Sequence, residues 1–128
     1  MFKPAHELVQ EAKKSVKEFT PAEIHDKMSI PETLLIDVRE PDEYRQGHIP
    51  GAINIPRGML EFRISNEPTL QNLTRPIVVY CKTSGRAALS VVAMQTMGFQ
   101  NVISLAGGFD AWLADQRAIV KPHDISFE

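Results

Sequence analysis

The stretch Ile77-Val78-Val79-Tyr80-Cys81-Lys82-Thr83-Ser84-Gly85-Arg86 joins an apolar run to a segment with helical spacing. Its first residues are rich in β-branched side chains, which is typical of a buried central strand. Arg86 to Met97 is predicted to follow as a helix, which Gly98 ends because glycine suits the position after a helix. The loop between them holds the only cysteine in the chain.

The segments on both sides repeat this order of strand and helix. Leu34 to Arg39 is a continuous apolar run that ends in charge, as expected of a buried parallel strand. Thr20 can cap a helix, with Glu23 completing a capping box. Further strands are predicted at 52–56 and 102–108, and further helices at 41–47, 58–64 and 108–116. We therefore expect an α/β fold whose mostly parallel central sheet has about five strands and helices on both faces.

Composition excludes several classes of protein. At 128 residues the chain fits one domain. Fourteen Lys and Arg face sixteen Asp and Glu, a net charge of -2 that argues against a general binder of nucleic acid or anionic membranes. No apolar run approaches the roughly 20 residues of a membrane span, and the charged N-terminus lacks a signal-peptide core, so we expect a cytoplasmic protein. One cysteine cannot form an internal disulfide, and the four histidines show no metal-ligand spacing.

The two ends of the chain are expected to lie outside the domain. Residues 2–17 have the spacing of an amphipathic helix, which we interpret as packed on the domain surface, with an oligomer or partner contact as the alternative. The apolar residues of that helix are Phe2, Ala5, Val9, Ala12 and Val16. The predicted organisation is a helical extension at 1–19, a domain at 20–116 and a tail at 117–128. The protein is expected to be a monomer or a weak homo-oligomer formed through the N-terminal helix.

Cys81 is placed where parallel α/β sheets bind ligands, at the carboxyl end of a strand. The loop 82–85 is short and polar, so its backbone N–H groups can converge into a nest for an anion, and the following helix adds its positive N-terminal end. A thiol in this position is expected to ionise more readily than a free one, and the thiolate is the reactive form. A lone cysteine is often only a small buried apolar residue, but the loop context favours a nucleophile.

The other loop residues are candidates for binding an anionic substrate. Lys82 and Arg86 would supply positive potential. Thr83 and Ser84 can donate hydroxyl hydrogen bonds, and Gly85 permits the backbone angles that a tight cradle needs.

Three segments together resemble the rhodanese family of sulfurtransferases. "CKTSGR" at 81–86 resembles the six-residue active-site loop of that family, which begins with the cysteine that forms a persulfide. "LLIDVREPDEYRQGHIPGAINIP" at 34–56 matches the first family signature, and "LAGGFDAW" at 105–112 matches the second. The resemblance runs from about Thr20 to Trp112 and implies a rhodanese-like fold.

The resemblance also implies an activity. Cys81 would accept a sulfane sulfur from thiosulfate or another persulfide donor and pass it to cyanide or a cellular thiol, by covalent ping-pong catalysis without a metal or organic cofactor. Lys82 to Arg86 would form the anion cradle. A protein persulfide partner is compatible with the same chemistry.

Other conspicuous residues are expected to be structural. Asp37 and Arg39 lie near the predicted pocket and are interpreted as a salt bridge or a brace of the loop rather than as catalytic groups. His48 is interpreted as fixing a turn, and Trp112 as core packing. Two positions are compatible with Arg57 and Arg63: the rim of the pocket, or a solvent-exposed face of the helix.

Two other functions are compatible with the same fold. Rhodanese-fold phosphatases and arsenate reductases have five residues between the cysteine and the arginine, whereas four separate Cys81 from Arg86. The shorter loop favours a sulfur atom over a phosphate. A non-catalytic binding or regulatory module is the second alternative, but such modules often lose the loop cysteine.

Overall fold

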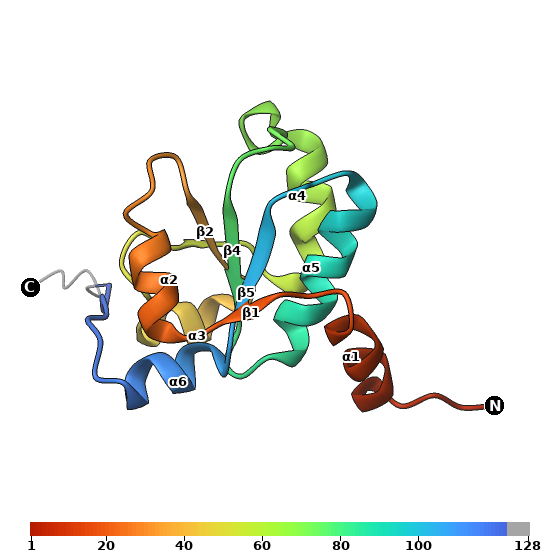
Figure 1. Cartoon of the computed structure of the whole chain (residues 1–128), viewed down its shortest axis with the longest axis horizontal. Helices are drawn as coiled ribbons and strands as arrows, with labels where there is room; N and C mark the ends of the chain where they lie inside the picture. The colour runs from red at the N-terminus through yellow and green to blue at the C-terminus, as the bar shows by residue number, and fades with distance from the viewer. Residues whose placement is uncertain (123–128) are drawn as a thin grey trace, which may run out of the picture.

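The computed structural model describes residues 1–122 and shows a five-stranded parallel sheet with helices on both faces (Figure 1). The strand order is β1-β5-β4-β2-β3. The strands are β1 (Glu18–Phe19), β2 (Leu34–Asp37), β3 (Ile53–Asn54), β4 (Ile77–Tyr80) and β5 (Val102–Leu105). The helices are α1 (Ala5–Lys13), α2 (Pro21–Lys27), α3 (Pro41–Gln46), α4 (Leu60–Asn66), α5 (Gly85–Met97) and α6 (Gly108–Ala114), with short 3-10 turns at Arg57–Met59 and Pro68–Leu70. The predicted α/β fold is confirmed.

The central strand β4 builds two hydrophobic cores, one on each face of the sheet. Successive side chains of a strand point to opposite faces. Ile77 and Val79 accordingly pack with α4 and α5, whereas Val78 and Tyr80 pack with α2 and α6. All four residues of β4 are buried, so the following loop begins at a strand that is packed on both faces.

The N-terminal segment differs from the prediction. The helix spans Ala5–Lys13 rather than residues 2–17, and Phe2 is 87% exposed. Glu18–Phe19, expected within a helical extension, form the edge strand β1 beside β5. The Ser104 N–H donates to the Lys17 carbonyl over 3.0 Å and the Ala106 N–H donates to the Phe19 carbonyl over 2.8 Å. These bonds to a distant strand make residues 17–19 part of the sheet.

Helix α1 packs along α5, on the face of the sheet that also carries α4 (Figure 1). Ala12 is buried there, and the amide of Gln95 donates to the Ser15 carbonyl over 3.0 Å. The first helix is therefore seated against the helix that follows the cysteine loop.

Part of the predicted tail packs on the domain. Val120 pairs with His48 in an antiparallel bridge, and the indole N–H of Trp112 donates to the Ala118 carbonyl over 2.9 Å. Residues 123–128 of the predicted tail lie outside the described residues. Within residues 1–122, no helix is long and apolar enough to cross a membrane. The same part of the chain holds no group of three or more His, Cys, Asp or Glu residues that could bind a metal ion.

Candidate active site

Cys81 follows the last residue of β4 and lies at the bottom of the loop that leads into α5. Its side chain is buried, with 1% of the residue exposed. The Sγ atom accepts a hydrogen bond from the backbone N–H of Ala87 over 3.4 Å. This contact directs the sulfur toward the N-terminal turn of a 13-residue helix, where the aligned peptide dipoles favour negative charge.

The loop turns its carbonyl groups toward α6. The Cys81 carbonyl accepts from the Phe109 N–H over 2.8 Å, and the Lys82 carbonyl accepts from the Asp110 N–H over 3.0 Å. The C=O and N–H of a trans peptide point in opposite directions, and residues 1–122 contain no cis peptide. The N–H groups of Lys82 and Thr83 therefore point away from α6.

These N–H groups have no partner in the part of the chain that the structure describes. The backbone N–H groups of residues 82–86 donate no hydrogen bond to any atom of residues 1–122. A run of unpaired N–H groups beside a helix N-terminus is an anion-binding arrangement. The loop can thus stabilise a negatively charged group attached to Cys81.

Gly108 makes this orientation of the loop possible. A Cβ atom at this position would lie 2.3 Å from the Thr83 carbonyl oxygen, 2.5 Å from that of Cys81 and 2.7 Å from that of Lys82. Its φ of +60° is also unfavourable for other residues. The sequence showed a Gly-Gly pair in the second signature. It did not reveal that the loop carbonyl groups pack directly against Gly108.

Gly85 does not have the role expected from the sequence. It was predicted to supply unusual backbone angles, but the positive-φ glycines of residues 1–122 do not include it. It is the first residue of α5, and an added Cβ would lie 3.4 Å from a methyl group of Val9 on α1. The left-handed angles are instead found at Gly107 and Gly108, because the tight turn lies before α6 rather than inside the loop.

The two hydroxyl residues of the loop differ in exposure. Thr83 is exposed and Ser84 is half-buried. The Ser84 carbonyl accepts from the Ala88 N–H over 2.9 Å, which begins the hydrogen bonding of α5.

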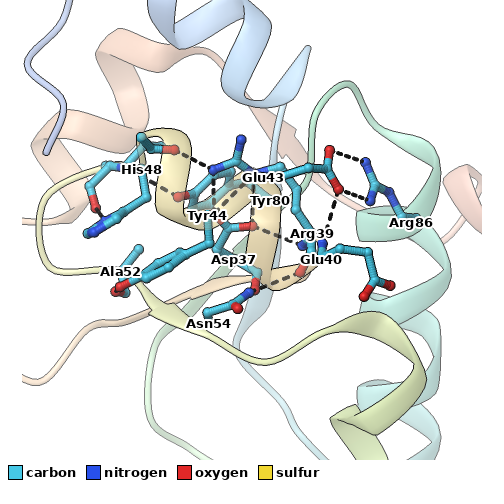
Figure 2. A network of polar contacts seen from close by, with 12 residues as sticks. Asp37, Arg39, Glu40, Glu43, Tyr44, His48, Ala52, Asn54, Tyr80 and Arg86 are labelled. Carbon is cyan, nitrogen blue, oxygen red and sulfur yellow. Dashed lines mark hydrogen bonds and ion pairs between the residues drawn. The ribbon is translucent and has the colours of Figure 1, made fainter. Parts of the chain in front are cut away.

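Each cation of the loop is paired with a carboxylate. Arg86 makes a bidentate ion pair with Glu43 of α3, with N–O distances of 2.7 and 3.1 Å (Figure 2). Lys82 Nζ lies 2.9 Å from a carboxylate oxygen of Asp110 on α6. Sequence reasoning placed both cations at the loop but missed both partners.

Glu43 is strongly perturbed by this arrangement. The hydrogen bond from Arg86 is the largest influence, and a backbone hydrogen bond from Glu40 adds to it, so the pKa of Glu43 falls to about 2. Hydrogen bonding to Glu43 in turn raises the pKa of Arg86, against a smaller effect of burial. The pair is therefore ionised at neutral pH and holds α3 against the start of α5.

Asp37 and Arg39 form a buried brace next to the loop. The Arg39 Nη2 atom donates to Asp37 Oδ2 over 2.7 Å (Figure 2). The same atom donates to the Gly47 carbonyl over 2.7 Å. The guanidinium also lies over the Phe109 ring at 4.3 Å. The Arg39 side chain is 5% exposed and the Asp37 side chain is 0% exposed. The pair connects β2, the end of α3 and the start of α6, which is a supporting geometry.

The remaining predicted residues lie in structural contacts. The His48 ring stacks on Tyr44 with centroids 3.9 Å apart, and its Nδ1 atom is 2.9 Å from the Ile49 carbonyl oxygen. Arg57 pairs with Glu61 on α4, and Arg63 pairs with Glu67. Trp112 is buried in the core on the α6 face.

Comparisons with known proteins agree with this arrangement. Residues 20–115 match the rhodanese-like domain family. A protein named sulfurtransferase from Allochromatium vinosum is 33% identical over 91 residues, which are 71% of this chain and 81% of that protein. The probable adenylyltransferase/sulfurtransferase MoeZ of Mycobacterium tuberculosis is 37% identical over 84% of this chain but only 27% of its own length. The uncharacterized protein YqhL of Bacillus subtilis is covered over 59% of its length, so the chain spans less than two thirds of several relatives.

Solved structures show the same fold over nearly the whole chain. A Rhodopseudomonas palustris protein of unknown function, described as a possible tyrosine phosphatase, has a TM-score of 0.84 at 31% identity, covering 94% of this chain and 96% of its own. The polysulfide-sulfur transferase homodimer of Wolinella succinogenes has a TM-score of 0.76 at 30% identity, covering 88% of this chain and 84% of its own. With its cysteine loop, Gly-Gly turn and matched residues, the chain belongs to the rhodanese-like domain family.

Proposed function

We propose that this protein is a sulfurtransferase that carries a sulfane sulfur on Cys81 as a persulfide. The observation that carries the proposal is the position of Cys81 Sγ below a loop whose five N–H groups, at residues 82–86, have no acceptor in residues 1–122. A persulfide extends the side chain by one charged sulfur atom, and these donors are suited to stabilise it. The family match and the relatives named sulfurtransferase support the same activity.

The first half-reaction transfers a sulfur atom from the donor to Cys81. The Cys81 thiolate attacks the outer sulfur of thiosulfate, a new S–S bond forms, and the S–S bond of the donor breaks. The electron pair leaves with sulfite, so the products are Cys81–S–S⁻ and SO₃²⁻. With a persulfide donor R–S–SH the donor S–S bond breaks and R–S⁻ leaves. This thiolate takes up the proton that the outer sulfur carried, so the products are Cys81–S–S⁻ and R–SH.

The second half-reaction transfers the outer sulfur atom from Cys81 to the acceptor. A thiolate or cyanide attacks the outer sulfur of Cys81–S–S⁻, and the Cys81 thiolate is regenerated as the leaving group. The product is a new persulfide or thiocyanate. The acceptor can be a small thiol or a protein thiol, and neither half-reaction requires a metal or an organic cofactor.

A phosphatase reaction is the alternative suggested by the description of the R. palustris protein. The loop has four residues between Cys81 and Arg86. The Nη1 and Nη2 atoms of Arg86 both donate to the Glu43 carboxylate. These features disfavour a tetrahedral phosphate, which needs a wider cradle and a free bidentate cation.

Intact-mass spectrometry tests the proposal. Incubation with thiosulfate or an alkyl persulfide should add the mass of one sulfur atom, and cyanide or dithiothreitol should remove it. Cys81→Ser should abolish the adduct. Absence of an adduct with every donor, or hydrolysis of p-nitrophenyl phosphate that depends on Cys81, would overturn the proposal.

A further inference from the structure

The cysteine loop is bordered by cations whose charge is already neutralised. The Arg86 guanidinium binds both carboxylate oxygens of Glu43, and Lys82 Nζ lies 2.9 Å from Asp110 Oδ2. Glu40 also contributes negative potential at Arg86. The positive field that the loop sequence suggests is therefore largely cancelled by residues from α3 and α6.

The carboxylates of both ion pairs line one cavity beside the loop. Its volume is about 390 Å³, and its lining includes Glu43, Lys82 and Asp110. Arg39 and Lys121 also line it, and Arg39 is paired with Asp37. A donor that reaches the loop from this side meets carboxylates as well as cations.

We propose that Glu43 and Asp110 are specificity-determining residues that favour persulfides of amino thiols, which carry little net charge, over dianionic donors such as thiosulfate. This inference rests on the proposed sulfurtransferase function. A dianion gains little from Lys82 and Arg86, because each of these cations is paired with a carboxylate, whereas an ammonium group on the donor can approach Glu43 or Asp110 favourably. In the transfer, Cys81–S⁻ attacks R–S–SH, the donor S–S bond breaks, and Cys81–S–S⁻ and R–SH form.

Of the two carboxylates, Glu43 is expected to have the larger effect. It makes two hydrogen bonds to Arg86 and its side chain is 31% exposed, whereas Asp110 makes one contact to Lys82 and is 47% exposed. Exposed ion pairs are weakened by solvent and salt. The Glu43–Arg86 pair also adjoins α5, whose N-terminus faces Cys81 Sγ.

The experiment measures the rate of Cys81 persulfidation in single-turnover mass spectrometry with three donors. Thiosulfate is a dianion, cysteamine persulfide carries an ammonium group, and 3-mercaptopropionate persulfide carries a carboxylate in its place. Glu43→Gln keeps a hydrogen-bonding oxygen for Arg86 but removes the charge, and Asp110→Asn does the same for Lys82. Glu67→Gln, on the exposed Arg63–Glu67 pair, is the control for an equal change in net charge.

At low ionic strength, Glu43→Gln should accelerate persulfidation by thiosulfate about five-fold, as expected for removing one charge about 8 Å from a dianion in water. Persulfidation by mercaptopropionate persulfide should also accelerate, and that by cysteamine persulfide should not. Asp110→Asn should act in the same direction by about two-fold. Each rate is compared between variants for one donor, so the intrinsic reactivities of the donors cancel.

The outcomes separate the two proposals. If wild-type Cys81 forms no adduct with any donor, the sulfurtransferase function itself fails. If the adduct forms but the rate ratio of thiosulfate to cysteamine persulfide in Glu43→Gln and Asp110→Asn equals that of Glu67→Gln, the specificity inference is wrong. Asp110→Asn keeps the test decisive if Glu43→Gln unfolds, which urea denaturation would reveal.

Discussion

Replacing Gly108 with alanine should displace the cysteine loop. The new Cβ would lie 2.3, 2.5 and 2.7 Å from three carbonyl oxygens of residues 81–83, and separations below 3.0 Å are essentially never found. These oxygens belong to the backbone, so no flexible side chain can move aside. The loop or the start of α6 must shift by about 0.7 Å to bring the shortest separation from 2.3 to 3.0 Å.

The expected loss of stability follows from these contacts. A non-glycine residue at the φ of +60° costs about 1 kcal/mol. The shift also weakens the hydrogen bonds from Phe109 N–H and Asp110 N–H to the loop carbonyls, each contributing about 1 kcal/mol. We expect Gly108→Ala to lower the free energy of unfolding by about 3 kcal/mol. Because the loop N–H groups move with the carbonyls, the persulfidation rate should fall at least about ten-fold, the factor that corresponds to 1.4 kcal/mol of lost stabilisation.

Gly51→Ala is the matched control. Gly51 has a φ of +83°, but nothing lies within 4 Å of an added Cβ, so this substitution introduces backbone strain without a collision. Urea denaturation and single-turnover mass spectrometry on both variants would separate the two effects. If Gly108→Ala is as stable as Gly51→Ala and forms the Cys81 persulfide at the wild-type rate, the argument that Gly108 supports the loop is wrong.

Three further predictions concern stability. Asp37→Asn leaves the Arg39 guanidinium buried without its counter-charge and should cost about 3 kcal/mol in urea denaturation, while a change below about 1 kcal/mol would contradict the brace. The pKa of Glu43 is about 2 in the folded protein against an ordinary 4.5, so its contribution is complete above pH 4.5 and is lost as the pH falls toward 2. Allowing for solvent screening, the free energy of unfolding of the wild type should fall by about 1 to 2 kcal/mol more than that of Glu43→Gln between pH 5 and pH 2. Urea denaturation of both proteins over this pH range measures the difference. A chain that begins at Thr20 lacks β1 and α1, which exposes one side of α5 and the edge of β5. Its free energy of unfolding should be at least about 3 kcal/mol lower. An unchanged urea midpoint would refute this.

Local patterns in the sequence were sufficient for the main elements and for the position of Cys81 in the fold. The β-branched run at 77–80 predicted β4, and Thr20 with Glu23 predicted the capping box that begins α2, because both signals depend on neighbouring residues. Cys81 could be placed at the carboxyl end of a strand for the same reason. The resemblance to the rhodanese family rested on motifs with fixed spacing, and the family match confirms it.

The contacts that adjust the site could not be predicted in this way. Glu43 and Arg86 are 43 residues apart, and Lys82 and Asp110 are 28 apart, so no local spacing indicates that each cation has a carboxylate partner. Strand β1 was missed because two residues have no recognisable period, and their pairing depends on β5, more than 80 residues away.

The sequence by itself therefore determined the α/β fold, the position of Cys81 and the length of its loop. The tertiary structure alone decided the charge of the site and the direction in which the loop N–H groups point. Propensity and periodicity act between residues close in the chain, whereas charge neutralisation and the carbonyl contacts at Gly108 act through space between α3, the loop and α6.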